Sequence, residues 1–497
     1  MNKYYRGLTK YEGLNFSKCF FFFEYYQVMG RMQKIFVSSK TCPQKNRTAS
    51  EGYVGGQTFI WISKTESIDN VDGKEYGLLE MILSPDNLNK AYLSVKRNKG
   101  AGGIDKMEVN ELGDYLRNHK DQLIVSILQG KYRPNAVRRV EIPKDGGKSR
   151  MLGIPTLVDR VIQQAIFQEL SKLYEPHFSD NSYGFRPKRS AHQALIRSKQ
   201  FISEGYHYAV DMDLEKFFDT VNHSRLIEIL SRTVKDNRVL SLIHRYLNAG
   251  VQVGGVISPS KEGVPQGGPL SPLLSNIMLN ELDKELERRG HRFVRYADDF
   301  LIFCKSKRSS QRVMQSITQF IETCLYLKVN REKSQTANYR KIKFLGYSFY
   351  KTKGECRLRV HPQSVVKMKA KVKELTSRSN GWGNERRKVA LSQFIKGWVQ
   401  YFKLADMKNL LRDTDKWYRR RLRMVIWKQW KLTKTKFTNL IKLGVRKSKA
   451  WEWSNTRKSY WHTAGSSILS TTITNERLRQ AGYLFFTNYY LSLKLVN

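Results

Sequence analysis

Cysteine is scarce in this sequence, and its spacing carries no metal or disulfide pattern. The 497 residues include five cysteines, and no two of them form a C-x-x-C pair. This spacing excludes the common sequence patterns of zinc sites and disulfide frameworks, and it is typical of a protein from a reducing cytoplasm. Apolar runs of membrane-spanning length are also absent, so we expect no membrane partner.

Acidic residues are few relative to basic ones. Lys and Arg total 88 against 44 Asp and Glu, which gives a formal net charge of +44. So large an excess repels itself in a compact fold unless an anionic partner is bound. Nucleic acid and an anionic membrane surface both fit this charge. Aromatic residues make up 12% of the chain, and because bases stack on aromatic rings, the composition favours nucleic acid.

The hydrophobic pattern separates an N-terminal extension from an organised remainder. Residues 1–77 lack clear periodicity and are expected to be a poorly ordered extension, with Met32 and Met81 as alternative starts. Ser271 is expected to cap a helix that has Pro272 at its first position. The predicted helices cover 85–98, 157–173, 191–203, 271–290, 364–378, 385–404 and 407–430, and the predicted strands lie within 131–155, 206–214, 292–296 and 300–304.

Two clusters of aspartates interrupt apolar strands. Alternation along residues 208–214 places Asp211 and Asp213 on one face and apolar residues on the other. Asp298 and Asp299 lie at the bend of the hairpin predicted over 292–304. Carboxylates are costly to bury without compensation, and their hard oxygens suit Mg²⁺. An Asp-Asp bend is commonly a solvated turn, but its coincidence with the first acidic strand favours a metal site.

A series of short blocks runs through the chain in a fixed order. The blocks are Gly100–Asp105, Glu141–Lys144, Leu152–Thr156 with Asp159-Arg160, Ser182–Pro187, Asp213–Asp219, Pro265–Pro272, Tyr296-Ala297-Asp298-Asp299 and Phe344–Tyr347. Any single block is a weak signal, whereas the ordered series is specific. The series resembles the reverse transcriptases that group II introns encode, and the resemblance covers roughly residues 78–497.

This resemblance implies an α+β fold of the right-hand polymerase type. Fingers and palm with an antiparallel sheet would occupy residues 78–358, and an α-helical thumb or maturase domain would occupy 359–445. Residues 446–497 would form a basic C-terminal segment that binds DNA or RNA. The segment Gly397–Phe402 is similar to part of the maturase region, which grips intron RNA in this family.

The resemblance also gives roles to the acidic residues. Asp213 matches the first metal-binding aspartate, Asp298 matches the second, and Asp299 is similar to a catalytic neighbour that ligates less directly. The backbone carbonyl of Leu214 is a further candidate ligand, whereas Asp211 is expected to be structural. Two Mg²⁺ ions, for which Mn²⁺ can substitute, would activate a 3′ hydroxyl and stabilise the leaving oxygen.

Five residues match positions that bind the nucleotide in this family. Lys144 and Arg150 flank a glycine-rich turn as triphosphate-binding cations do, with a solvated basic hairpin as the alternative. Phe218 resembles the bulky gate that excludes a 2′ hydroxyl, with a core phenylalanine as the alternative. Gln266 lies beside glycines that allow close approach of the backbone, and Lys333 resembles a further triphosphate contact.

Five arginines are candidates for nucleic-acid contacts. Arg186 is either a template contact or a buried structural pair, and the sequence leaves both interpretations open. Arg419, Arg420, Arg421 and Arg423 precede tryptophans, and this mixture is typical of an RNA-binding surface. More than half of the tryptophans in this region are expected to be helix core instead.

Taken together, the resemblance implies an RNA-directed DNA polymerase of the bacterial cytoplasm that copies intron RNA and assists splicing and retrohoming. Its partners would be group II intron RNA, an RNA template with a DNA primer, deoxynucleotides and target DNA, with the chain as monomer or homodimer. Many relatives carry an H-N-H endonuclease with paired C-x-x-C motifs, which this sequence lacks, so it is similar to the bacterial class C forms. Two alternatives stay open: a maturase that only assists splicing, and an intron-like reverse transcriptase domesticated for phage defence.

Overall fold

The computed structural model describes residues 60–61, 77–143, 149–260 and 262–495. Within them the chain divides into two compact units, which meet in sequence between Asn338 and Tyr339. The predicted extension over residues 1–77 lies outside the described residues, apart from Ile60, Trp61 and Gly77. Helices and strands both occur before Asn338, and helices predominate after Val360, so the expected α+β class with a helical C-terminal region is confirmed.

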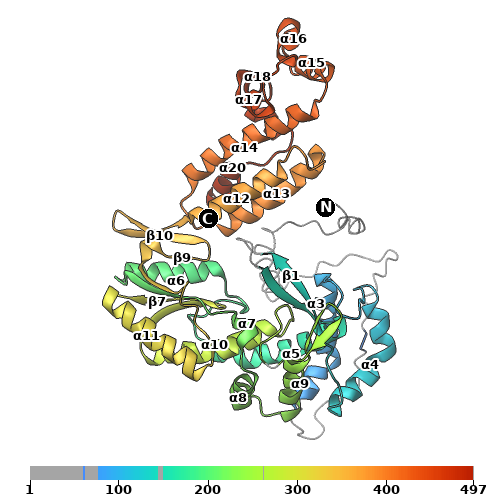
Figure 1. Cartoon of the computed structure of the whole chain (residues 1–497), viewed down its shortest axis with the longest axis vertical. Coiled ribbons are helices and arrows are strands. Elements are labelled where there is room, and N and C mark those ends of the chain that lie inside the picture. Colours follow the sequence, from blue (N-terminus) through green and yellow to red (C-terminus); the bar gives the residue numbers. More distant parts are fainter. Residues whose placement is uncertain (1–59, 62–76, 144–148, 261, 496–497) are drawn as a thin grey trace, which may run out of the picture. The chain divides into compact units, whose positions relative to one another are not determined.

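The unit before Tyr339 holds most of the strands (Figure 1). Its elements are α2 (Leu78–Leu83), α3 (Pro85–Asn98), α4 (Leu112–Leu128), β1 (Val137–Pro143), β2 (Ser149–Ile154), α5 (Leu157–Tyr174), η2 (Glu175–His177), α6 (Ala191–Ser203), β3 (Tyr208–Met212), α7 (Phe217–Thr220), α8 (His223–Thr233), α9 (Asn237–Asn248), β4 (Val251–Val253), β5 (Val256–Ser258), α10 (Ser271–Arg288), β6 (Arg292–Tyr296), β7 (Asp299–Cys304), α11 (Lys307–Cys324) and β8 (Gln335–Asn338).

An antiparallel sheet with the strand order β6-β7-β3-β8 carries both aspartate clusters. Its side chains alternate as the sequence predicts, because Val210, Met212 and Phe300 all enter the hydrophobic core. Helices α10 and α11 contribute to that core. Helix α6 covers part of the opposite face, where the rings of Phe201 and Phe303 lie 5.6 Å apart (Figure 1).

A second sheet, with the order β2-β1-β4-β5, holds the predicted strand–turn–strand. Strands β1 and β2 pair antiparallel from Arg138↔Ile154 to Pro143↔Ser149, while β1 pairs parallel with β4. The carbonyl of Gln266 accepts a 2.7 Å hydrogen bond from the Gly153 amide of β2. This bond attaches the Pro265–Gly268 loop to the sheet.

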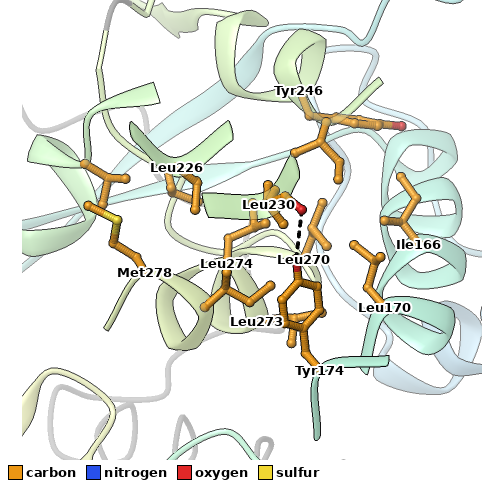
Figure 2. Packing of buried hydrophobic residues seen from close by; sticks show 14 of the residues in the cluster. Ile166, Leu170, Tyr174, Leu226, Leu230, Tyr246, Leu270, Leu273, Leu274 and Met278 are labelled. Atoms are coloured by element: carbon orange, nitrogen blue, oxygen red, sulfur yellow. Dashed lines mark hydrogen bonds between the residues drawn. The ribbon is translucent and has the colours of Figure 1, made fainter. Parts of the chain in front are cut away.

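The core of this unit joins helices that are far apart in the sequence. Ile166, Leu170 and Tyr174 of α5 pack with leucines of α8 and α10, as Figure 2 shows. The Tyr174 hydroxyl donates a 3.2 Å hydrogen bond to the Leu230 carbonyl, so the buried phenol is not left unpaired. A fully buried leucine side chain stabilises such a core by roughly 1.5–3 kcal/mol, and this packing holds the sheet's supporting helices in place.

Ile60 and Trp61 also belong to this core. Both residues are buried, and the Asn89 Oδ1 of α3 accepts hydrogen bonds from their two amides at 3.1 and 3.2 Å. The Asn89 Nδ2 returns a 2.7 Å hydrogen bond to the Trp61 carbonyl, and Lys120 donates to the carbonyl of Ile60. The Asn89 side chain thus pairs with three backbone groups of this dipeptide, because its amide supplies both a donor and an acceptor.

The second unit has one small sheet followed by helices. Its elements are η3 (Tyr339–Lys341), β9 (Lys343–Phe344), β10 (Tyr347–Thr352), β11 (Glu355–Val360), α12 (Pro362–Leu375), α13 (Asn384–Tyr401), α14 (Lys408–Gln429), α15 (Thr433–Lys442), α16 (Lys447–Ser454), α17 (Tyr460–Gly465), α18 (Ser467–Thr472), α19 (Asn475–Gln480) and α20 (Phe486–Leu495). The sheet has the order β11-β10-β9. Trp398 and Trp427 are buried, Trp451 is 63% exposed, and the other tryptophans after Val360 are half-buried, so the expectation that more than half belong to the helix core is not confirmed.

The predicted elements agree closely with the observed ones, but helices α4, α8, α9 and α11 were not predicted and one predicted helix cap is wrong. Helices α3, α6 and α10 start at the predicted residues. Ser271, however, does not cap α10, whose N-cap is Leu270. The Ser271 hydroxyl instead donates a 2.6 Å hydrogen bond to the Pro265 carbonyl. Among the described residues, no helix is both long and apolar enough to span a membrane.

Candidate active site

Asp298 lies at the tip of the β6–β7 hairpin, and Asp299 is the first residue of β7. The last pair of the hairpin is Tyr296↔Asp299, so Ala297 and Asp298 form a two-residue loop. Ala297 has a φ of 60°, in the left-handed region that costs a non-glycine residue roughly 1–2 kcal/mol. Asp298 is exposed and Asp299 is half-buried. The turn therefore presents two carboxylates beside each other at one end of the sheet.

The strand register brings the first acidic strand to the same end. Strands β3 and β7 pair antiparallel as far as Met212↔Phe300. Continuing this register by one residue places Asp213 opposite Asp299, next to the loop that holds Asp298. Alternation then puts Asp213 and Asp299 on the same face of the sheet. The two aspartate clusters that are 85 positions apart in the sequence, Asp213 and Asp298, are thus brought together as expected.

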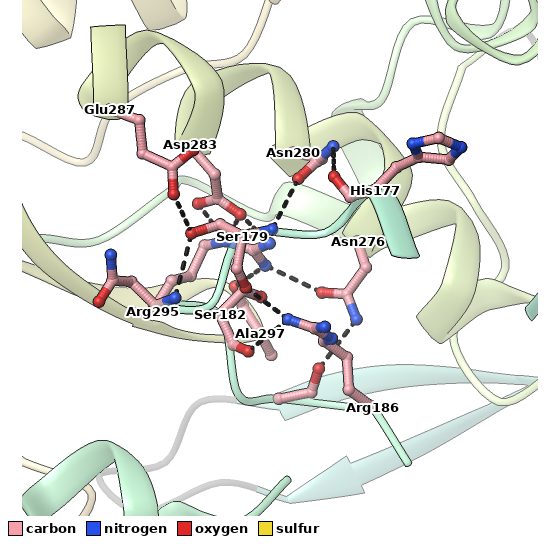
Figure 3. Close-up of polar contacts among 12 residues, drawn as sticks. His177, Ser179, Ser182, Arg186, Asn276, Asn280, Asp283, Glu287, Arg295 and Ala297 are labelled. Carbon is pink, nitrogen blue, oxygen red and sulfur yellow. Dashed lines mark hydrogen bonds and ion pairs between the residues drawn. The ribbon is translucent and has the colours of Figure 1, made fainter. Parts of the chain in front are cut away.

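A buried arginine connects the hairpin tip to helix α10. Arg295 and Asp283 of α10 have no exposed side-chain surface, and Nε lies 2.8 Å from Oδ1. The same guanidinium donates to the Asn276 Oδ1 at 2.9 Å and to the Ala297 carbonyl at 3.0 Å. Figure 3 shows these contacts converging on one side chain. The bond to Ala297 holds the strained residue directly before Asp298.

The loop over Ser182–Pro187 is hydrogen-bonded to the same hairpin and packs closely against it. The Tyr183 amide donates to the Arg295 carbonyl at 2.9 Å, and the Asn276 Nδ2 donates to the Gly184 carbonyl at 2.8 Å. A Cβ atom on Gly184 would lie 2.2 Å from the Ala297 amide nitrogen. Only glycine permits this close approach, which explains the Gly of the Tyr-Gly-Phe-Arg-Pro block.

Asp213 has contacts on both its side chain and its backbone. Its Oδ2 lies 2.9 Å from the Nζ of Lys333, and the two side chains are 44% and 62% exposed. Its amide donates to the Ser334 hydroxyl at 3.1 Å, and its carbonyl accepts from the Asn330 amide at 2.8 Å. Asp211 accepts a 3.3 Å hydrogen bond from Gln335 of β8, and its structural role stays a prediction.

The acidic end of the sheet fits Mg²⁺ in its donor chemistry. Within the part of the chain that the structure describes, no three His, Cys, Asp or Glu side chains gather to enclose a metal ion. Mg²⁺ commonly needs no such enclosure, because it keeps waters and binds through one or two carboxylates together with substrate phosphates. Asp213 with Asp298 or Asp299 matches this type of site. The Lys333 ammonium is already paired with Asp213, which indicates that this carboxylate binds a positive charge.

The predicted nucleotide-binding residues are only partly described. Lys144 lies outside the described residues, and Arg150 is placed by its backbone in β2, opposite Ile142. Gln266 is half-buried in the loop attached to β2. Lys333 contacts Asp213, as given above, so a triphosphate contact by this residue stays a prediction.

Phe218 is one of two adjacent buried rings. Phe217 and Phe218 are 3% and 4% exposed, belong to the hydrophobic core, and contact each other edge to face at 5.2 Å. The Phe218 carbonyl accepts a 2.6 Å hydrogen bond from the amide of Val264, which precedes the Pro265–Gly268 loop. Core packing is thus one function of both rings. The gate against a 2′ hydroxyl stays a prediction for Phe218.

The structure favours the structural interpretation of Arg186. This side chain is buried and forms an ion pair with Glu175 at 2.9 Å. It also donates to the Ser182 carbonyl at 2.8 Å (Figure 3). A guanidinium whose donors are directed at protein acceptors is poorly placed to contact a template. The alternative role in template binding is therefore not supported by the geometry.

The arginines of α14 are half-buried within their own unit, contrary to the open RNA-binding surface expected of them. Arg420 donates to the Trp461 carbonyl at 2.9 Å and stacks over that indole at 4.1 Å. Arg421 donates to the carbonyls of Lys373 and Thr376 at 3.0 and 3.1 Å. Burial lowers the pKa of Arg421.

Arg423 and Arg419 make similar internal contacts. Arg423 donates to the Ile473 carbonyl at 2.8 Å, and burial lowers its pKa as well. Arg419 lies over the ring of Phe485 at 5.6 Å. These four residues therefore connect α14 to the elements around it. A run of charged residues in the sequence does not distinguish a phosphate partner from a carbonyl partner, so these internal contacts are not predictable from it.

The functional residues that sequence reasoning missed are the supports of the two acidic clusters. Arg295 and Asp283 hold the hairpin tip, while Ser334 and Asn330 hold the Asp213 backbone. The available signal for Arg295 and Asp283 was that each is a charged residue within an apolar pattern, Arg295 in strand β6 and Asp283 in helix α10. No comparable signal marks Ser334, because a serine in a polar loop is common.

Two regions of the chain match known protein families. Residues 142–349 match the family described as reverse transcriptase (RNA-dependent DNA polymerase), and residues 365–444 match the maturase-specific domain of group II introns. The group II intron-encoded protein LtrA of Lactococcus lactis subsp. cremoris is 32% identical in an alignment 382 residues long that covers 63% of this chain and 62% of LtrA. This chain thus spans less than two thirds of the length of LtrA.

Further relatives agree with these matches. Protein YkfC of Escherichia coli (strain K12) is 33% identical in an alignment 298 residues long that covers 52% of this chain and 78% of YkfC. A putative COX1/OXI3 intron 2 protein of Saccharomyces cerevisiae is 25% identical in an alignment 441 residues long that covers 70% of this chain and 51% of that protein.

Proposed function

Because the chain belongs to the family of reverse transcriptases with a maturase domain that group II introns encode, we propose that it copies RNA into DNA and binds its host intron RNA to assist splicing and retrohoming. The observation that carries the polymerase activity is the strand register that brings Asp213 to the Asp298–Asp299 turn. Its substrates would be deoxynucleotides and a DNA primer on an RNA template, and its further partners would be intron RNA and target DNA.

The acidic residues would hold the catalytic cations. Asp213 and Asp298 would supply side-chain oxygens, with the Leu214 carbonyl as a further ligand and Asp299 as the less direct neighbour. When bound, two Mg²⁺ ions, or Mn²⁺ in their place, would lower the barrier to nucleotidyl transfer by activating the primer's 3′ hydroxyl and stabilising the leaving oxygen. The Arg295 contact to Ala297 keeps the turn in place, since a misplacement of about 1 Å can cost roughly 100-fold in rate.

Residues around this end of the sheet would bind the nucleotide. Lys144 and Arg150 would contact the triphosphate, and Gln266 would approach the nucleotide from the loop that Gly153 holds. In that loop Gly267 has a φ of 120°, and a Cβ atom there would lie 2.5 Å from the Gly153 carbonyl oxygen. This constraint supports the proposal that the loop is built for close backbone approach. Phe218 would lie beneath the sugar.

The proposed architecture is a right-hand polymerase. Residues 78–358 would be fingers and palm, residues 359–445 a helical thumb with maturase function, and residues 446–497 a nucleic-acid-binding segment. The antiparallel sheet β6-β7-β3-β8 and the helical region after Val360 support this arrangement.

RNA binding would rest on exposed basic residues after α14 rather than on the arginines of α14. The stretch from Lys431 to Lys458 contains one acidic residue, Glu452. The exposed basic residues in it are Lys431, Lys434, Lys442, Arg446, Lys447, Lys449, Arg457 and Lys458. Trp451 is 63% exposed and contacts Phe437 edge to face at 6.1 Å, so its indole is available for stacking. Affinity for RNA should fall steeply with salt, because phosphate contacts release counterions.

The test is primer extension by the purified chain on an RNA template, paired with a splicing assay on the host intron. We expect Mg²⁺-dependent cDNA synthesis from a DNA primer together with faster splicing. Splicing assistance without cDNA synthesis would assign the chain to the splicing-only alternative. cDNA synthesis without any effect on the intron would instead favour a domesticated enzyme, as in phage defence.

A further inference from the structure

The segment Lys328–Ser334 is fastened to the backbone around Asp213. The Glu215 amide donates to the Lys328 carbonyl at 2.8 Å, and the Asn330 amide donates to the Asp213 carbonyl at 2.8 Å. A third hydrogen bond joins the Asp213 amide to the Ser334 hydroxyl at 3.1 Å. This attachment fixes the main chain that carries Lys333 beside the main chain that carries the catalytic carboxylate.

The turn within this segment positions Lys333 itself. The amides of Lys333 and Ser334 both donate to the Asn330 carbonyl, at 3.3 and 2.9 Å, and the Asn330 side chain accepts a further bond from the Lys333 amide at 3.3 Å. Ser334 is buried, so the turn is anchored on its inner side. The local backbone therefore places Lys333 within reach of Asp213, and the Lys333 Nζ lies 2.9 Å from the Asp213 Oδ2.

We propose that Lys333 is the resident counter-ion of Asp213 in the nucleotide-free protein and that it must leave this carboxylate when a divalent cation binds. The ammonium would then move to the phosphates of the nucleotide that arrives with the metal. Binding of metal and nucleotide would be coupled, because the nucleotide supplies a new anionic partner for the lysine that the metal displaces. This inference rests on the proposed function, since it takes Asp213 as a metal ligand.

Simple electrostatics sets the size of the effect. A unit charge and a divalent cation about 4 Å apart repel each other in water by an amount equivalent to roughly 30-fold in affinity. Salt screening weakens this repulsion between exposed groups. Removing the ammonium should therefore strengthen metal binding to the nucleotide-free protein by roughly 5- to 30-fold. Loss of a merely structural contact would weaken metal binding or leave it unchanged.

The experiment measures Mn²⁺ binding to the full, nucleotide-free chain by electron paramagnetic resonance of the free ion. Lys333→Met should bind Mn²⁺ roughly 5- to 30-fold more tightly than the unsubstituted chain. Lys333→Arg, which keeps the charge, should retain the weaker binding. Lys328→Met is the matched control, because it removes one exposed lysine of the same segment that contacts the Asp213 region through its backbone carbonyl. Its Mn²⁺ affinity should stay within about twofold of the unsubstituted chain, since the Lys328 ammonium is exposed to solvent and screened by salt.

Equal or weaker binding by Lys333→Met would overturn the proposal, and so would an equal gain in Lys328→Met. The Asp213→Asn substitution separates this inference from the proposed function. It should remove the tight Mn²⁺ binding of Lys333→Met when the two are combined. If the double variant still binds Mn²⁺ tightly, Asp213 is not the ligand, and the metal assignment fails together with the counter-ion role. If binding is lost in the double variant but Lys333→Met shows no gain, only the counter-ion role fails.

Discussion

Arg295 and Asp283 form an ion pair with no exposed surface on either side chain, and the same arginine donates to the carbonyl of Ala297, the residue before Asp298. The pair therefore connects helix α10 to the turn that carries the candidate catalytic aspartates. Because both charges are buried, each depends on the other for compensation.

Arg295→Met should destabilise the protein by about 3–5 kcal/mol, because it leaves the Asp283 carboxylate buried without its partner. The free energy of unfolding from chemical denaturation measures this loss. Adding Asp283→Leu should recover a large part of the stability, since no buried charge then remains. cDNA synthesis should stay low in the double variant, because the Ala297 carbonyl still lacks its donor. Full activity in the stable double variant would show that the arginine does not position the turn.

Arg421→Met should lower the free energy of unfolding by about 1–3 kcal/mol, since it leaves the carbonyls of Lys373 and Thr376 without this donor. Lys434→Met is the control for charge, because Lys434 is exposed on α15. We expect that control to weaken RNA binding in a salt-dependent way and to leave stability within about 0.5 kcal/mol. Thermal or chemical unfolding together with RNA titrations at two salt concentrations measures both effects. A stable Arg421→Met variant with greatly reduced RNA affinity would return this arginine to the RNA interface.

Phe218→Val should relax discrimination against ribonucleotides by at least roughly 10-fold, the scale on which small volume changes act in a substrate pocket. The measurement is the ratio of kcat/KM for a deoxynucleotide to that for the matching ribonucleotide. Phe217→Val is the matched control, because the two rings are adjacent and equally buried. It should reduce stability without changing the ratio. If Phe218→Val keeps the original ratio, Phe218 acts only in core packing and is not the gate against a 2′ hydroxyl.

The sequence predicted the acidic strand and the hairpin because both follow from local periodicity. Val210 and Met212 alternate with Asp211 and Asp213, and a period of two fixes their faces whatever the strand packs against. The order of the family blocks then connected Asp213 to Asp298. The strand and the hairpin thus depended on near neighbours in the chain, whereas the connection between Asp213 and Asp298 depended on the resemblance to the family.

Contacts between distant segments were not predictable in the same way. The pattern of α10 shows that Asp283 lies on a helix, but it does not show that Arg295 reaches it from β6. Likewise, Arg421 and an exposed lysine have the same appearance in an amphipathic pattern, although one donates to carbonyls of its own fold. The anchoring of Lys333 also required the pairing of Asp213 with the segment Lys328–Ser334.

The central claim is that the Asp298 turn and Asp213 form one catalytic centre, and Asp298→Ala tests it most directly. Primer extension on an RNA template and RNA affinity should be measured on the same purified variant. We expect cDNA synthesis to be abolished while RNA affinity stays essentially unchanged, because Asp298 is exposed at a turn and its loss removes a metal ligand without removing a core contact. Retained cDNA synthesis by a folded Asp298→Ala chain would contradict the account.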